Sequence, residues 1–382
     1  MDYGNYFGYD TENIEKIMNS KKVKYTKLMS MVKNYVTRES IGKNVNIYID
    51  MNTILKQIYN KDNIEIFNHL KSDKRLFITA EIINIIGHYR HFFSSRLKMY
   101  TTFYLFTSFE KSSYHTNIYP DYRKEYYEKR LGDRDFVFSN INKIIKDNMN
   151  IVKKILKYVP NAYLINTKDN DPSLVPTYLL NDNRFTLDTD LNIIISNDKL
   201  FRQDLLYRDN TLILEIKGKD NKRLIAYEDV INTIVDSTKG KRVYSDYNLL
   251  TESITLLDPL VKNKEYNINS IKRTSEMKAL DIIEKGINDN IISSQSYYDV
   301  DEAYNDLAFY LGENNEDEFK RNMSIVNHKI AMSHTFKDLE HVILSQIIDL
   351  EDDRGLMELN DKFFSKYPIV MDYLGESFYD PR

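Results

Sequence analysis

Short apolar segments that alternate with helical patterns place the strongest constraint on the fold of this chain. The segment NVNIYIDMNTILKQIYN (44–60) has the pattern of a strand that leads directly into a helix. Further strands are predicted at TTFYLF (101–106), AYLI (162–165) and LNIIIS (191–196), and TLILEIKGKDNKRLIAY (211–227) is typical of a β-hairpin. This alternation favours an α/β fold with a mainly parallel sheet that helices flank on both faces.

Helical patterns occupy the regions before and after these strands. Residues 11–40 carry apolar side chains at helical spacing, and the chain is again mainly helical from about residue 228 onward. The most acidic segments lie within 291–382. Because 382 residues exceed the length of an ordinary single domain, we expect two units, or one α/β domain with sizeable extensions.

Composition excludes several classes of function. The chain has no cysteine, so disulfides, thiolate catalysis and cysteine-ligated zinc or iron–sulfur clusters are ruled out. Its net charge of −4 gives no overall field that attracts DNA, so any DNA contact needs a local basic patch. No apolar run approaches the length of a membrane span and no signal peptide opens the sequence, so a soluble, intracellular protein without membrane contacts is expected.

Acidic residues follow three of the predicted strands. Asp50 lies in YIDMN, Asp169 and Asp171 lie in TKDNDPS, and Asp198 lies in SNDKL. Because the carboxyl ends of parallel strands meet at one edge of a sheet, these carboxylates can converge on a divalent metal ion. Acids at strand ends also cap helices and solvate turns, and the pattern alone leaves both interpretations open.

Taken in order, these segments resemble the 5′-3′ exonuclease and flap endonuclease family, whose catalytic domain has a PIN-like fold. IYIDMNTILKQIYN resembles the family's opening strand and helix, and TNIYPDYRKEYYEKR is similar to the segment with its Tyr-Pro-x-Tyr-Lys-like signature. LINTKDNDPS and IIISNDKLFRQDL resemble its acidic cluster and its Asp-Lys-Asp turn. LLDPLVKNKEYNINSIKRTSEMKALDIIEKGI resembles the helix-hairpin-helix segment that grips duplex DNA, so the resemblance covers about residues 41–290.

The chain is expected to have four regions, two of which lie within this resemblance, and a metal centre. The regions are an N-terminal helical extension (1–40), a PIN-like nuclease-fold domain (41–227), a helix-hairpin-helix-like region (228–290) and an acidic C-terminal helical extension (291–382). The resemblance also implies that Asp50, Asp169, Asp171 and Asp198 stand at metal-binding positions.

The departures from the family fall where the chemistry needs carboxylates. Thr107, Pro172 and Leu200 stand where the family has acids, and KNKEY (262–266) lacks both aspartates of the family's Gly-Asp-x-x-Asp element. A catalytic pair of Mg²⁺ ions needs a dense ring of anionic oxygens. We therefore expect a vestigial site with no cofactor, or with one Mg²⁺ or Mn²⁺ ion if activity survives.

The segments that would contact DNA are altered as well. Ser270, Arg273 and Ser275 occupy hairpin positions where the family has glycines that let backbone amides approach phosphates. The cations that remain candidates for phosphate contacts are Arg123, Lys124, Lys272, Arg273 and Lys278. The expected DNA binding is therefore weak.

Three functions are compatible with these patterns. The first is a catalytically degenerate flap-nuclease-like protein that acts as a structural or assembly component, in a bacteriophage particle or a replication complex, with protein partners on its N- and C-terminal extensions. The second is a metal-dependent 5′ nuclease with one ion on Asp50, Asp171 and Asp198. The third is a DNA-binding module that does not cleave. We favour the first, with a location in the virion or the host cytoplasm, because metal ligands and phosphate-binding glycines are lost together.

Overall fold

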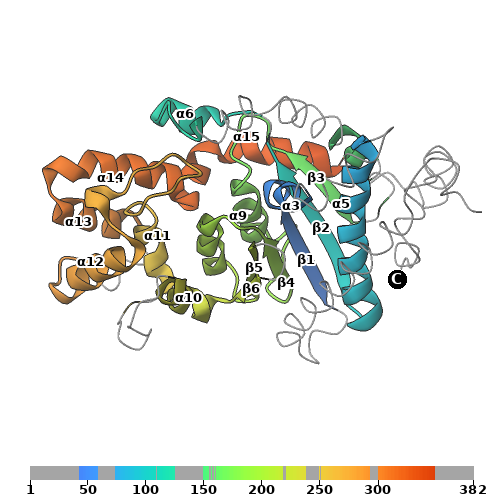
Figure 1. Ribbon diagram of the computed structural model, residues 1–382, viewed down its shortest axis with the longest axis horizontal. Helices are drawn as coiled ribbons and strands as arrows, with labels where there is room; N and C mark the ends of the chain where they lie inside the picture. Colours follow the sequence, from blue (N-terminus) through green and yellow to red (C-terminus); the bar gives the residue numbers. More distant parts are fainter. Residues whose placement is uncertain are drawn as a thin grey trace, which may run out of the picture.

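The computed structural model describes residues 43–58, 74–108, 110–124, 149–154, 156, 159, 161–217, 221–237, 249, 251–292 and 300–348 (Figure 1). The helices expected within residues 11–40 lie outside these ranges, as do residues 349–382 of the acidic C-terminal region.

A six-stranded sheet forms the centre of the described chain, in the strand order β3-β2-β1-β4-β5-β6. The strands are β1 (Asn44–Asp50), β2 (Tyr100–Thr107), β3 (Ala162–Asn166), β4 (Leu191–Ile195), β5 (Thr211–Lys217) and β6 (Asn221–Ile225). Strands β1 to β5 pair in parallel, and β6 pairs antiparallel with β5. The predicted mainly parallel sheet and its terminal hairpin are therefore confirmed.

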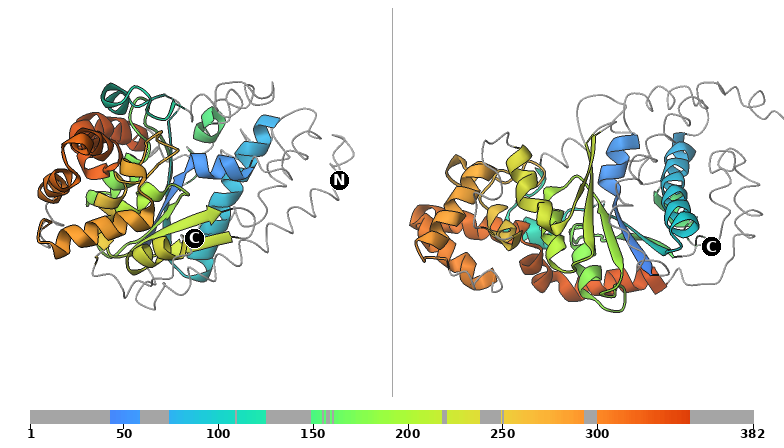
Figure 2. Two further views of the ribbon diagram at one scale, coloured as in Figure 1. Left: turned by 60° about the vertical axis from the view of Figure 1, so that its left-hand side comes forward. Right: turned by 90° about the horizontal axis from the view of Figure 1, so that it is seen from below.

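Alternate residues of the central strand enter two separate cores. Ile47 and Ile49 of β1 pack into one core, whereas Tyr48 between them packs into the other. The first core is closed by α3 (Met51–Ile58), α5 (Lys74–Arg90) and the π-helical segment η2 (His91–Arg96), as Figure 2 shows. A strand with apolar side chains on both faces is stable only where helices cover both, which accounts for the layered α/β architecture.

The opposite face is covered by helices that lie far apart in the sequence. They are α9 (Leu174–Asn181), the 3₁₀ segment η3 (Lys199–Leu206) and α15 (His328–Ile348). Gln346 of α15 bonds both backbone groups of Asn166 at the end of edge strand β3, over 2.9 Å and 3.0 Å. Part of the region expected to be a C-terminal extension therefore forms one layer of the α/β core.

A helical region follows the sheet, as predicted, and lies to one side of it in Figure 1. Its elements are η4 (Tyr227–Asp229), α10 (Val230–Ser237), η6 (Thr251–Ser253), α11 (Ile254–Leu257), η7 (Ile271–Arg273), α12 (Glu276–Asn288), α13 (Val300–Leu311) and α14 (Glu313–Val326). Lys272 and Arg273 have positive φ angles of 48° and 55°. Both residues of this turn therefore have the left-handed backbone conformation that glycine usually adopts.

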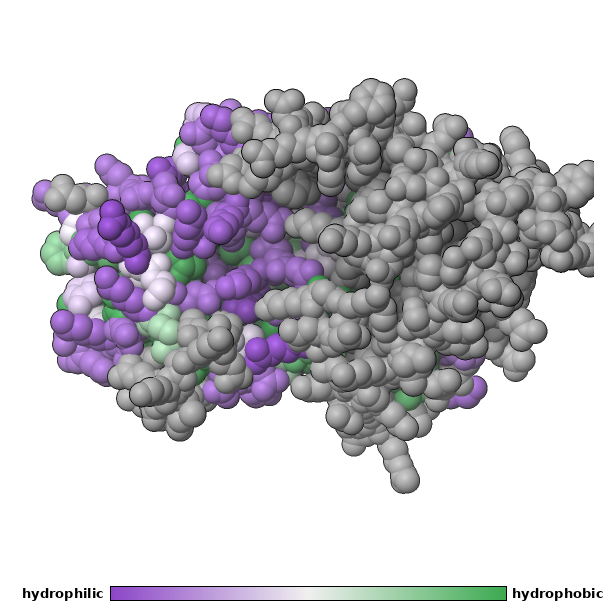
Figure 3. Space-filling model, in the orientation of Figure 1, coloured by the Kyte–Doolittle hydropathy of each residue, from purple (hydrophilic) through white to green (hydrophobic). Residues whose placement is uncertain are grey.

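The described surface is mostly hydrophilic on the face shown in Figure 3. The large hydrophobic side chains that are exposed, Tyr100, Leu187, Phe309 and Phe336, come from four different segments. Single exposed apolar residues of this kind are normal on protein surfaces. Within the described ranges, no helix combines the length and the apolar character that a bilayer crossing requires.

Candidate active site

Asp50 ends strand β1 and starts helix α3. Its Oδ1 accepts a hydrogen bond from the backbone N–H of Asn52 at 2.9 Å. Its Oδ2 accepts hydrogen bonds from the hydroxyls of Thr53 at 2.7 Å and Ser196 at 2.8 Å. Because Ser196 directly follows β4, Asp50 both caps α3 and joins the ends of two neighbouring strands.

Asp198 occupies the corresponding place after β4, where it caps η3. Its Oδ1 accepts a hydrogen bond from the backbone N–H of Leu200 at 3.0 Å, and its Oδ2 accepts one from the Tyr266 hydroxyl at 2.6 Å. Its own N–H donates to the Ser196 hydroxyl at 3.1 Å, so one serine connects Asp198 with Asp50.

The two acids that follow β3 have different environments. Asp171 is 2% exposed, and its Oδ1 accepts a hydrogen bond from the Ser173 N–H at 2.8 Å. Its Oδ2 accepts a hydrogen bond from the Tyr122 hydroxyl, and the guanidinium of Arg123 lies 3.5 Å from Oδ1. The side chain of Asp169, by contrast, is exposed. The structure therefore buries three of the four predicted acids. Ser196 joins Asp50 and Asp198, whereas Asp171 is linked to Asp198 through Tyr122 and Tyr266.

Four buried side chains pack against Asp171 and Asp198, and we call them the tyrosine plug: Tyr122, Arg123, Leu200 and Tyr266. The two tyrosine rings lie 5.7 Å apart between centroids, and the guanidinium carbon of Arg123 lies 4.3 Å from the Tyr266 ring centroid. Ile325 and Val326 at the end of α14 pack against the tyrosines and Leu200. With exposures between 0% and 3%, the plug is part of a hydrophobic core.

A neutral histidine supports the plug from the short helix α6 (Ser113–Ile118). The His115 ring stacks on Tyr122 with centroids 4.6 Å apart and planes inclined by 14°. Burial, with a further contribution from Arg123, lowers the pKa of His115 to about 3. The imidazole therefore remains uncharged at neutral pH and acts as a flat packing surface, held by the Ser112 hydroxyl at 2.7 Å from Nδ1.

Burial raises the pKa of all three aspartates. It raises the pKa of Asp171 to about 6 and that of Asp198 to about 7, and it also raises that of Asp50. The half-buried carboxylate of Glu265 acts in the same direction on each of them. Buried carboxylates have raised pKa values both in a metal site that lacks its ion and in a structural cluster of acids, so the hydrogen-bond partners are what distinguish the two.

The residues present do not fit a catalytic metal pair. Among the residues that the structure describes, no three His, Asp or Glu side chains converge closely enough to hold an ion. Every carboxylate oxygen of Asp50, Asp171 and Asp198 already accepts a hydrogen bond from the protein. Thr107, at the end of β2, is buried, and its hydroxyl has no hydrogen-bond partner within the described ranges. Protein donors thus already occupy the carboxylate oxygens that an ion would need as ligands.

Comparison with solved structures identifies the fold. The sequence matches no family model and no curated protein. The phage T5 flap endonuclease, in a pseudo-enzyme–product complex with DNA and metal ions, aligns with 81% of this chain and 100% of its own, with a TM-score of 0.53 and 13% identity. The T5 5′-exonuclease with bound zinc covers the same shares, with a TM-score of 0.52 and 15% identity. This chain has the flap-endonuclease fold.

On this flap-endonuclease fold, the predicted DNA-contacting cations occupy two kinds of place. Arg123 lies inside the plug, 3% exposed, so it is not presented to a phosphate. Lys124, Lys272, Arg273 and Lys278 are exposed. Lys124 pairs with Asp121 at 3.2 Å, and Lys272 donates to the backbone oxygen of Leu311 at 3.1 Å.

Sequence reasoning missed the groups that bind the aspartates. It treated Tyr122 and Arg123 as parts of a family signature, with Arg123 as a candidate for a phosphate contact, and Leu200 and Tyr266 only as lost carboxylates. A usable signal was present, because large apolar or aromatic residues at two acid positions of one site indicate that its space is filled. Glu265, next to Tyr266, was likewise noted only as part of an altered motif.

Proposed function

We propose that this protein is a catalytically degenerate member of the flap-endonuclease fold, and that it acts as a structural or assembly component of a phage particle or a DNA-processing complex. The observation that carries the proposal is the tyrosine plug. Tyr122 and Tyr266 donate to two of the aspartates on which a metal ion would depend, and Leu200 is buried beside them.

Charge supports the same conclusion. A divalent ion in this site would offset the negative charge of the clustered carboxylates, and the buried guanidinium of Arg123 already supplies positive charge next to Asp171. The raised pKa values of Asp171 and Asp198 reduce the remaining negative charge near neutral pH. The site is therefore stable as a protein core without an ion.

The close packing beside the carboxylates also supports a catalytically degenerate site. Mg²⁺ keeps several water molecules, so a catalytic site needs an open volume beside its carboxylates. The four residues of the plug are almost fully buried, and they pack together with the end of α14. Admission of an ion, its water and a DNA strand would require these side chains to leave a close-packed core.

A second candidate function is DNA binding without cleavage. Lys272, Arg273 and Lys278 are exposed within one short segment, η7 and the start of α12. Neighbouring cations of this kind favour contact with a phosphate backbone, and the affinity would fall steeply as salt rises. Duplex binding that depends on these residues, without cleavage, would support this function over the assembly role.

Cleavage of a 5′-flap DNA substrate in Mg²⁺ or Mn²⁺ tests the main proposal. The expected result is no cleavage above that of the variants Asp50→Ala and Asp198→Asn, with the phage T5 enzyme as the active control. Asp198→Asn is nearly isosteric, and circular dichroism checks that both variants are folded. Metal-dependent cleavage by the natural chain that either variant abolishes would establish a reduced-site nuclease and refute the proposal.

A further inference from the structure

Helices α14 and α15 join with only Asn327 between them, so the chain passes in one residue from the helical region to the layer beside the sheet (Figure 1). Gln203 of η3 bonds to both ends of this junction. Its Nε2 donates to the backbone oxygen of Val326 at 2.8 Å, and its Oε1 accepts the N–H of His328 at 3.3 Å. Segment η3 therefore fixes the point at which α14 ends and α15 begins.

His328, the first residue of α15, is a buried titratable group at this junction. It is 1% exposed, and its Nδ1 lies 3.2 Å from Asp204 Oδ1 and 3.1 Å from the Thr177 hydroxyl oxygen. Because the Thr177 hydroxyl donates to the same Oδ1 at 2.6 Å, its oxygen accepts from Nδ1, and Nδ1 carries a proton in both charge states. The imidazole Nε2 is buried with no hydrogen-bond partner in the described part of the chain. The proton that titrates is therefore the one on Nε2.

The carboxylate of Asp204 gives the charge of His328 its effect. Asp204 is fully buried, and its Oδ2 has no hydrogen-bond partner within the described ranges. Burial by itself lowers the pKa of His328, but the charge of Asp204 and its hydrogen bond outweigh burial, so this pKa is raised above its usual value. Loss of the Nε2 proton leaves a buried carboxylate without a compensating charge, which is costly.

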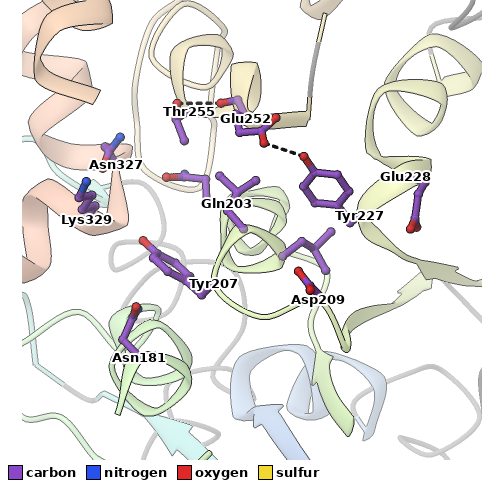
Figure 4. Close-up of a pocket in the computed structure, with 12 residues that line it drawn as sticks. Asn181, Gln203, Tyr207, Asp209, Tyr227, Glu228, Glu252, Thr255, Asn327 and Lys329 are labelled. Atoms are coloured by element: carbon purple, nitrogen blue, oxygen red, sulfur yellow. Dashed lines mark hydrogen bonds between the residues drawn. The ribbon is translucent and has the colours of Figure 1, made fainter. Parts of the chain in front are cut away.

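A cavity beside the junction gives it room to move. The cavity has a volume of about 530 Å³ and is lined in part by Gln203, Asn327 and Lys329, which Figure 4 shows around it. The Nδ2 of Asn327 is a further buried atom with no hydrogen-bond partner among the described residues. Unpartnered polar atoms at a helix junction, with open space beside them, indicate a contact that is weaker than the close-packed core around it.

We propose that His328 is a pH-sensitive latch that holds the junction of α14 and α15 against η3. Protonated His328 pairs with Asp204 and keeps the junction closed, and loss of the Nε2 proton lets the junction open locally. Because the pKa of His328 is raised in the folded protein, the stability from this pair is fully present below the usual histidine value of about 6.5 and is lost as the pH rises through the folded value. Neither residue belongs to the tyrosine plug, so the latch is independent of the function proposed above.

Other charged groups act on His328 from the elements around it. They are Asp198 at the start of η3, Asp171 before α9, Asp258 after α11 and His115 of α6, and Arg202, which acts on Asp258, is itself paired with Glu215. Burial raises the pKa of Asp258 to about 7, as it does that of Asp198, whereas His115 remains uncharged. These acids ionise over the same pH range as the latch, so only a comparison between variants isolates the part due to His328.

Side-chain NMR of the natural chain with labelled histidines tests the charge of His328 directly. The imidazole should titrate with a pKa above about 6.5, and this pKa should fall in Asp204→Asn. The matched control Asp338→Asn, at an exposed residue of α15, should leave the titration of His328 unchanged. A His328 pKa at or below about 6.5 in the natural chain would overturn the proposal whether or not the variants fold.

Amide hydrogen exchange tests whether this charge holds the junction. The N–H of Ala331 bonds to the backbone oxygen of Asn327 at 3.0 Å, so its protection reports on the start of α15. After correction for the intrinsic exchange rate, this protection should fall at least about threefold from pH 6 to pH 9, because the neutral ring keeps its hydrogen bond to Asp204 and loses only its charge. His328→Gln should show a smaller fall, whereas His341→Gln, at an exposed residue of α15, should show the full one. An equal fall in His328→Gln and the natural chain would mean that the neighbouring acids control the junction, and the latch would be refuted.

Discussion

The loss of one hydroxyl group tests whether the tyrosine plug stabilises the buried carboxylates. Tyr266→Phe keeps the ring and removes the 2.6 Å hydrogen bond to Asp198 Oδ2. Tyr266 is 1% exposed and Asp198 is 8% exposed, so water cannot readily replace the lost donor. The free energy of unfolding should fall by about 1.5–3 kcal/mol when Asp198 is ionised, and by about 0.5–1.5 kcal/mol when it is protonated.

The pH dependence of this loss has a definite sign. In the folded protein, the pKa of Asp198 is raised to about 7. The protonated carboxyl therefore contributes stability, which is lost as the pH rises from the pKa of Asp198 in the unfolded chain towards about 7. The Tyr266 hydrogen bond favours the ionised form and lowers this pKa. Its removal raises the pKa further, so Tyr266→Phe should destabilise the protein more at pH 9 than at pH 5, by about 1 kcal/mol or more.

Urea unfolding followed by far-UV circular dichroism measures this effect, since the chain has no tryptophan. Tyr119→Phe is the matched control, because the Tyr119 hydroxyl donates to an uncharged backbone oxygen, that of Asn267, at 3.2 Å. The Tyr119→Phe variant should lose about 0.5–1.5 kcal/mol of unfolding free energy, and this loss should be independent of pH. If Tyr266→Phe costs no more at pH 9 than at pH 5, the hydroxyl does not stabilise an ionised Asp198 and our account of the plug is refuted.

Further expectations concern the plug and the core. Leu200→Asp should lower the free energy of unfolding by about 2–5 kcal/mol, because Leu200 is 1% exposed and the variant buries a carboxylate. If Mg²⁺ restores this stability in urea unfolding, the site still accepts an ion. Glu215→Gln should cost about 3–5 kcal/mol, because it leaves the buried Arg202 guanidinium without its carboxylate 3.3 Å away; a loss below 1 kcal/mol would contradict this. Gln346→Ala removes both bonds to the end of β3 and should increase amide hydrogen exchange at Asn166, where unchanged exchange would show that α15 does not secure this edge.

The sheet could be predicted because its signals are local. Apolar runs such as LNIIIS mark a strand wherever it lies in the fold, and the runs between helical patterns favour parallel pairing. The places where acids follow strands were equally visible, and three of those four acids are buried. Asp169 differs because its turn directs the side chain to solvent, and this orientation depends on neighbours that the pattern does not specify.

The sequence by itself determined the α/β fold, since strand and helix patterns follow from residue types at successive positions. The loss of carboxylates from the site is a prediction from the family resemblance. Only the tertiary structure decided which side chains surround Asp171 and Asp198. Tyr122 and Tyr266 reach Asp171 and Asp198 across 49 and 68 residues of sequence, and α15 returns to the edge of β3 across 180. Such contacts depend on how whole helices pack against the sheet, so a strand-end aspartate has the same local pattern whether it faces a metal ion or a tyrosine hydroxyl.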